Sequence, residues 1–164
     1  MMSAGNGAMY GNIQGIKNLM SHYDKDGDYI NPVNGLAGLL VTDENESSRK
    51  RIISIPDSSK EEMYELTKKE SLRENGVHNG DTTKRTDVYN NLYRKMSKKD
   101  RLAAGYTLEK YERIYRQAFY DAAKKADPNW EIGKPIKDGA LDSVTRETAE
   151  SGKSPAQATL DTKI

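Results

Sequence analysis

The sequence predicts a mainly α-helical protein: a small bundle of about three helices, with a short N-terminal helix, a β-hairpin and extended polar arms. Two observations predict this fold class. Apolar residues recur at helical spacing over much of residues 57–127. Leu, Ile, Val and Phe supply only 27 of the 164 residues, below the ~20% at which a globular core becomes doubtful. We therefore expect a small helical core flanked by segments with little to bury.

The region before the bundle divides into two parts. Residues 1–11 are mostly Gly, Asn, Ala, Met and Ser and predict a flexible N-terminal arm. Residues 12–56 should hold a short helix, an acidic turn and a β-hairpin. The short helix follows from apolar side chains at spacings of three and four, namely Ile13, Ile16, Met20 and Tyr23. The hairpin would pair residues 39–42 with the β-branched run 51–55, which ends at Pro56.

Residues 57–127 carry the strongest helical signals. Ser59 with Glu62 resembles a capping box, and Asn75-Gly76 supplies a residue pair that closes a helix. A second helix is predicted over residues 84–96, followed by a short helix ending at Gly105. Thr107 should then cap the longest helix, which runs to Asp127. Its apolar stripe comprises Leu108, Tyr111, Ile114, Tyr115, Ala118, Phe119 and Ala122.

Residues 128–164 predict an extended C-terminal arm. The segment has no helical periodicity, and Trp130 is the aromatic side chain that would pin it to the bundle. Residues 1–11 and about 145–164 offer few apolar groups against the backbone entropy lost on ordering. We expect both arms to be disordered in an isolated monomer and to contact other subunits rather than the bundle.

Composition argues against several classes of protein. The chain has no cysteine, which excludes disulfides and thiolate zinc sites. It has only two histidines, which makes a Ser/His/Asp triad improbable. No apolar run is long enough to span a bilayer, and no secretory signal pattern begins the chain. Nucleotide-binding, hydrolase and zincin motifs do not occur, and His78 is expected at the surface of a loop. The sequence predicts a soluble protein that does not act on a membrane, is not an enzyme and needs no cofactor.

The acidic turn is the candidate metal site. Asp24, Asp26 and Asp28 alternate after a predicted helix, and clustered carboxylate oxygens suit Ca²⁺. The segment resembles the first half of an EF-hand loop. It departs from that pattern because Tyr29 stands where Gly is expected and the closing bidentate Glu is missing. The resemblance implies at most weak Ca²⁺ binding, and the alternative is a solvated Asp/Gly turn.

Residues 84–127 form a basic segment, with 12 basic and 6 acidic side chains in a chain of net charge +1. Such a segment attracts acidic partners, nucleic acid among them. The interleaved tyrosines mostly share the apolar stripe, which favours a role in the core over stacking on bases. The candidate nucleic-acid contacts are Arg94, Lys95, Lys98, Lys99, Arg101, Arg113 and Arg116.

Three functions follow in order of preference. A small core with long polar arms favours a non-enzymatic structural or interaction protein, a subunit of a large assembly such as a virus or phage particle, whose partners are other protein subunits. The first alternative is a nucleic-acid-binding protein that uses segment 84–127. The second is a secreted bacterial effector, suggested by the Gly- and Asn-rich start.

Overall fold

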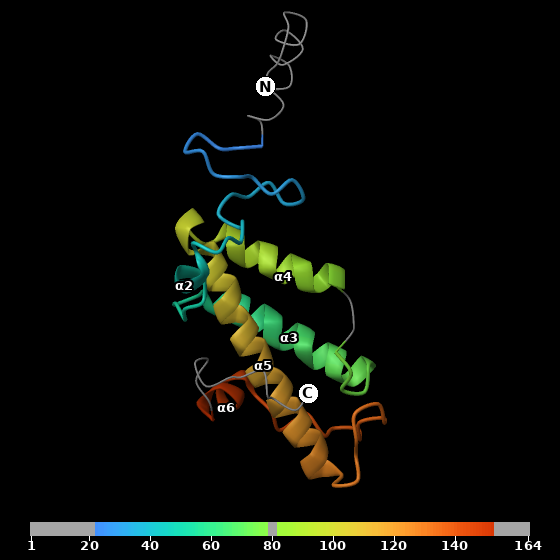
Figure 1. The fold of residues 1–164 in the computed structure, drawn as a ribbon. Helices are drawn as coiled ribbons and strands as arrows, with labels where there is room; N and C mark the ends of the chain where they lie inside the picture. Colours follow the sequence, from blue (N-terminus) through green and yellow to red (C-terminus); the bar gives the residue numbers. More distant parts are fainter. Residues whose placement is uncertain (1–21, 79–81, 153–164) are drawn as a thin grey trace, which may run out of the picture.

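The computed structural model describes residues 22–78 and 82–152, and these residues are mainly helical (Figure 1). The helices are α2 (Glu46–Arg49), α3 (Asp57–Arg73), α4 (Thr82–Arg94), the 3₁₀ turn η1 (Lys98–Asp100), α5 (Arg101–Ala126) and α6 (Arg146–Ser151). The three long helices α3, α4 and α5 pack on one another as a small bundle, as the sequence predicts. No helix in the described part of the chain is long and apolar enough to cross a membrane.

The core lies between α3 and α5, with α4 closing one side. Tyr64 of α3 meets Tyr115 and Phe119 of α5, with ring centroids 5.4 and 5.3 Å apart. Met63, Leu92 and Leu108 are also fully buried. The predicted stripe of the longest helix is confirmed, since Leu108, Ile114, Tyr115 and Phe119 all face this core. Tyrosine therefore supplies much of the bulk that a chain with one phenylalanine lacks.

The longest helix begins earlier than predicted. Residues 101–126 form one continuous helix, so Gly105 does not end a helix and Thr107 does not cap one. Gly105 is instead a point of close approach: a Cβ there would lie 2.8 Å from the Tyr93 hydroxyl. Thr107 is fully buried, donates to the Ala103 carbonyl and accepts from the Ile53 amide at 3.0 Å.

The start of α3 differs from prediction, whereas its end is confirmed. The helix begins at Asp57, directly after Pro56, without a side-chain cap. Ser59 is fully buried inside the helix, so the predicted capping box does not form. Asn75 and Gly76 have φ of 56° and 86°, the left-handed conformation that closes a helix.

The predicted hairpin is absent from the described residues, where the bridges Tyr23–Tyr29 and Ile30–Ala37 occur in isolation. Residues 39–42 and 51–55 find other partners. The Asn45 side chain donates to the Leu40 carbonyl and accepts from the Thr42 amide, which leads the chain into α2. The Ile53 amide donates to the Thr107 hydroxyl of α5 instead of to a neighbouring strand.

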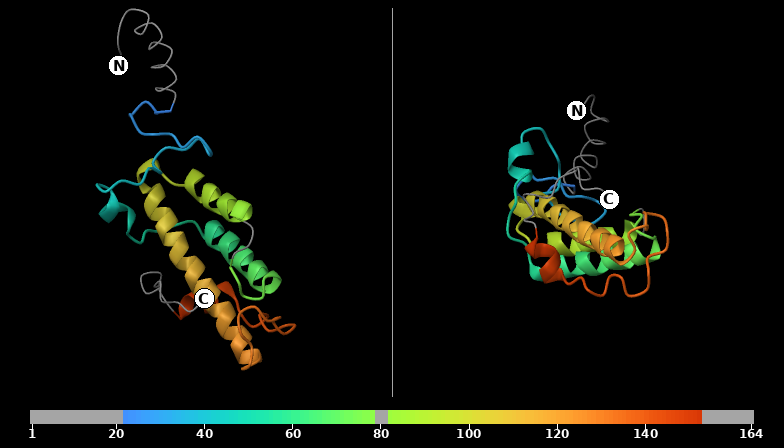
Figure 2. Two further views of the ribbon diagram at one scale, coloured as in Figure 1. Left: turned by 45° about the vertical axis from the view of Figure 1, so that its right-hand side comes forward. Right: turned by 90° about the horizontal axis from the view of Figure 1, so that it is seen from below.

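Residues 128–152 pack against the bundle of the same chain, contrary to our expectation for residues 145 onward. Trp130 and Leu141 are both 2% exposed, and Trp130 pins its segment as predicted. The Tyr64 hydroxyl donates to the Val144 carbonyl at 2.8 Å, and α6 packs on α5 with Ala149 in the core. Figure 2 shows α6 lying against α5. The arm of residues 1–11 and the last residues of the chain lie outside the described part.

Candidate functional site

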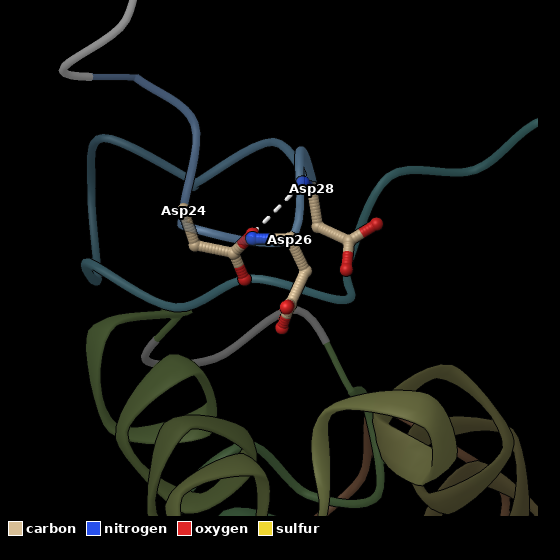
Figure 3. Close-up of side chains that lie close together, drawn as sticks. All are labelled: Asp24, Asp26 and Asp28. Carbon is tan, nitrogen blue, oxygen red and sulfur yellow. Dashed lines mark hydrogen bonds between the residues drawn. The ribbon is translucent and has the colours of Figure 1, made fainter.

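The acidic turn is a locally determined loop. The Asp24 carboxylate accepts from the backbone amides of Asp26 and Asp28, each at 2.9 Å, and Gly27 takes a φ of 83°. This arrangement is an Asx turn, the ordinary use of aspartate before a glycine. Carboxylate oxygens of the three aspartates lie within 4.8 Å of one another (Figure 3). The pattern that suggested a calcium loop therefore does bring three carboxylates together.

Lys98 provides the positive charge of this cluster. Its ammonium lies 2.7 Å from Asp24, 2.8 Å from Asp26 and 2.6 Å from Asp28. The hydrogen bond that Lys98 donates lowers the pKa of Asp24, and the hydrogen bonds that it donates to the three aspartates raise the pKa of Lys98. A cation such as Ca²⁺ would have to compete with an ammonium ion that the protein itself supplies. The contact also ties residues 24–28 to the start of α5.

Two further contacts complete this junction between the N-terminal part and α5. Arg101 donates to the carbonyls of Tyr93 and Ala37, both at 2.8 Å. Gly38, at a φ of 83°, passes so close to Lys98 that a Cβ on it would overlap the Lys98 carbonyl oxygen. Residues 22–45, which we call the N-terminal segment, are thus held by Lys98 and Arg101 over the end of the bundle where α5 begins (Figure 1).

Two grooves adjoin the junction. The larger holds about 410 Å³, and the smaller about 290 Å³. Leu102 and Arg49 line both. The larger is also lined by Tyr23, Tyr29, Leu40, Lys99 and Ala103, and the smaller by Val41, Tyr89, Tyr93 and Tyr106. Leu40 and Val41 are 55% and 58% exposed, so this end of the molecule presents apolar side chains to solvent beside the grooves.

The candidate nucleic-acid contacts are scattered over different sites. Lys98 binds the acidic turn and Arg101 binds backbone carbonyls. Arg116 pairs with the buried Glu112 in a very short contact, and Arg113 lies 3.7 Å from Glu109. Arg94 donates to Asn91, and Lys95 donates to Ser58. Arg94, Lys95 and Lys99 are the exposed members of the set, and Lys99 lines the larger groove.

A buried charge cluster at the centre of the bundle escaped the sequence analysis. Glu70 of α3 is fully buried and lies 2.6 Å from Arg85 of α4. The same Arg85 reaches Glu112 of α5 at 2.8 Å, and Glu112 also binds Arg116. Helical spacing does place both glutamates on the apolar faces of their helices. Glu70 follows Met63 by seven residues, and Glu112 follows Leu108 by four. The cluster joins all three long helices.

His78 lies beside this cluster instead of at the surface. Its side chain is 5% exposed, and its Nδ1 is 4.0 Å from the Glu70 carboxylate. Burial, together with the positive charges of Arg116 and Arg85, lowers the pKa of His78 to about 4. A small cavity of about 10 Å³ lies beside it, near Ser71 and Trp130. That volume is about the size of one water molecule, which leaves no room for a substrate.

The fold and these contacts define a small helical bundle with a buried charge cluster and an N-terminal segment held by Lys98 and Arg101. The chain belongs to the family described as "Domain of unknown function (DUF3879)", which matches residues 1–164. No curated protein and no solved structure matches the chain.

Proposed function

We propose that this chain is a non-enzymatic interaction protein, a subunit of a large assembly of the kind found in a virus or phage particle. The observation that supports this proposal most is the apolar surface around the two grooves. Five of the seven large apolar side chains that are exposed in the described residues lie between residues 23 and 52. They are Tyr23, Val33, Leu40, Val41 and Ile52, of which Tyr23, Leu40 and Val41 line the grooves.

Concentrated apolar exposure marks interaction surfaces, because isolated soluble proteins rarely keep such side chains in water without a use for them. The grooves beside Leu40 and Val41 would accept apolar side chains of a partner. Arg49 and the exposed Lys99 line the larger groove and favour an acidic residue next to them. The partner is therefore another protein subunit that presents an extended segment with apolar and acidic side chains.

Several contacts favour this function over the alternatives. The charged residues at the centre of the bundle, Glu70, Arg85 and Glu112, are paired with one another, as in a structural network. Lys98, Arg101 and Arg116 hold the fold together, so they are less available to phosphates than the sequence suggested. Nucleic-acid binding stays an alternative that the experiment below distinguishes.

The test compares the sedimentation of the full chain in extracts of its native cells with that of the purified protein. We expect the wild type to sediment with a large complex, and a Leu40→Ser/Val41→Ser variant to be released from it. Ile132→Ser is the matched control, because Ile132 is 40% exposed on a different surface. Release of both variants, or of neither, would contradict the proposed surface.

Nucleic-acid binding would give a different result. A complex that dissolves on nuclease treatment, with an affinity for DNA or RNA that falls steeply with salt, would identify phosphate contacts. That result would replace the assembly subunit with a nucleic-acid-binding protein.

A further inference from the structure

A third groove lies between α3 and α4, away from the N-terminal segment. It holds about 400 Å³, and Leu66 and Val88 form its apolar floor. The charged residues of α3 that line it and face outward are Glu61, Glu65, Lys69 and Arg73. Along α3 the order is acidic at 61–65 and basic at 69–73, apart from the buried Glu70. The groove therefore has one negative end and one positive end on the side of α3.

The outer face of α3 carries charge that is only partly paired. Glu61 lies 3.2 Å from Arg146, and Arg73 lies 3.1 Å from the neighbouring Glu74. Glu61, Glu65, Lys69 and Arg73 are all exposed. Neither Glu65 nor Lys69 forms a salt bridge within the described residues, although they stand four apart on one helix. Glu61 and Glu65 lie against each other, and desolvation together with this like charge raises the pKa of Glu61. Arg146 offsets part of this repulsion at Glu61, and a second protein surface that places a cation beside Glu65 would offset more of it.

The helix dipole does not account for the charge order. Acidic residues near the start and basic residues near the end stabilise a helix, but the effect is confined to its first and last turns. Glu65 and Lys69 lie in the middle of α3, which spans residues 57–73. Their placement therefore calls for a different explanation.

The charge order is self-complementary under a two-fold axis. Positions 61 and 73 are equally far from Thr67, and so are positions 65 and 69. Thr67 itself is buried in the core and marks only the midpoint of this face. Two antiparallel α3 helices with the two-fold axis level with Thr67 would place Glu61 near Arg73 of the second copy and Glu65 near Lys69 of the second copy. The symmetry repeats each pair, which is the property of an isologous interface.

We propose that two copies of this chain associate through the α3/α4 groove, with their α3 helices antiparallel and paired by these charges. The second copy would be one partner of the assembly subunit proposed above, so this proposal rests on that function. The contact is polar and lies at the surface, so added salt should weaken it.

The test is a charge swap in the full-length protein, followed by sedimentation velocity over a range of concentrations at low salt. The wild type should show a concentration-dependent dimer. Glu65→Lys alone and Lys69→Glu alone should each weaken dimerisation by about tenfold or more, because two attractive pairs become repulsive. The double variant Glu65→Lys/Lys69→Glu restores opposite charges across the axis and should restore the dimer.

Lys125→Glu is the matched control for Lys69→Glu, since it makes the same change of charge at an exposed position of α5. Circular dichroism confirms that each variant is folded. A wild type that stays monomeric, equal behaviour of the single variants and the control, or a double variant that stays monomeric would each overturn the proposal. None of these changes touches Leu40 or Val41, so loss of the dimer and loss of the larger assembly are measured separately.

Discussion

Lys98 shows how one side chain can take the place of a metal ion. The three aspartates converge as the calcium-loop pattern predicts, but the cation they bind is an ammonium from residue 98 of the same chain. From the sequence, Lys98 was a candidate nucleic-acid contact and the aspartates were candidate Ca²⁺ ligands. Their contact joins residues 74 positions apart, which local residue spacing cannot predict. The closing ligand of a calcium loop is also missing, so two separate features oppose metal binding.

Calcium titration of Lys98 variants tests this substitution of one cation for another. The wild type should bind Ca²⁺ no more tightly than about the millimolar range. Lys98→Met removes the competing charge and should bind Ca²⁺ more tightly than the wild type does. Isothermal titration calorimetry measures both, with Lys99→Met as the control that keeps the wild-type affinity. Micromolar binding by the wild type that disappears in Asp24→Asn would show that the loop is a working calcium site.

His78 should make stability depend on pH. Its pKa is about 4 in the folded protein against 6.5 for the free side chain. Between these values the unfolded chain binds a proton that the folded chain does not bind, so stability is full above pH 6.5 and falls as the pH drops toward 4. The loss attributable to this histidine is at most about 3 kcal/mol.

Urea unfolding at pH 7 and near pH 4.5 measures this loss. His78→Leu should lose less stability between the two pH values than the wild type loses. His22→Leu, a change at an exposed histidine, should behave as the wild type does. An unchanged pH dependence in His78→Leu would show that other groups cause the acid destabilisation.

At the scale of elements, the helices were predictable where apolar spacing is long and regular. The stripe from Leu108 to Phe119 identified α5, although its start was misplaced at Thr107. Gly105 was predicted to end a helix because glycine ends many helices. The tertiary structure shows instead that the Tyr93 side chain packs against Gly105 where a Cβ would lie. The capping box at Ser59 failed for a similar reason: the seryl side chain is buried in the packed face of α3.

Phe119 tests the importance of the α5 stripe. It is 1% exposed and packs on Tyr64, so Phe119→Ala should destabilise the protein by about 3 kcal/mol or more through the cavity it leaves. Thermal or urea unfolding measures the loss. Lys125→Ala on the same helix is exposed and should change stability little. Equal effects of the two changes would contradict the assignment of the buried face.

Gly38 tests the junction between the N-terminal segment and α5. Gly38 and Gly27 share a φ of 83°, but a Cβ at Gly27 would meet open space, whereas one at Gly38 would overlap the Lys98 carbonyl. Both alanine variants carry the backbone strain, so the difference between them reports the steric clash. We expect Gly38→Ala to expose the N-terminal segment to limited proteolysis more than Gly27→Ala does. Similar cleavage of the two variants would contradict this close contact.

At the scale of the whole molecule, the main difference from prediction is that the chain after Trp130 stays packed on the bundle as far as residue 152. Trp130, Leu141 and Ala149 are buried, but each stands among polar neighbours, so the sequence shows no periodicity there. The buried Glu70 and Glu112 were missed because acidic residues are expected at the surface. The sequence therefore predicts the three long helices well and the contacts between distant segments poorly.

Removing the C-terminal part tests its contribution to the bundle. A chain that ends at Asp127 lacks Trp130 and Leu141 and leaves the Tyr64 hydroxyl without its partner at Val144. Its free energy of unfolding should fall by about 3–5 kcal/mol or more, the cost of removing one large buried side chain. Urea unfolding followed by circular dichroism measures this change. Unfolding at the wild-type urea concentration would show that residues 57–127 are a complete domain, as the sequence alone suggested.

The bond between Lys98 and Asp24 also sets an order of events during synthesis on the ribosome. Asp24 is made 74 residues before Lys98. At about 5–20 residues per second, this separation amounts to about 4–15 seconds of translation. Throughout that interval the N-terminal segment, with Leu40 and Val41, has been made but its docking place at the start of α5 has not. A nascent chain of this protein therefore exposes Leu40 and Val41, the residues that we propose bind a partner, to chaperones or to neighbouring nascent chains before it can complete its own fold.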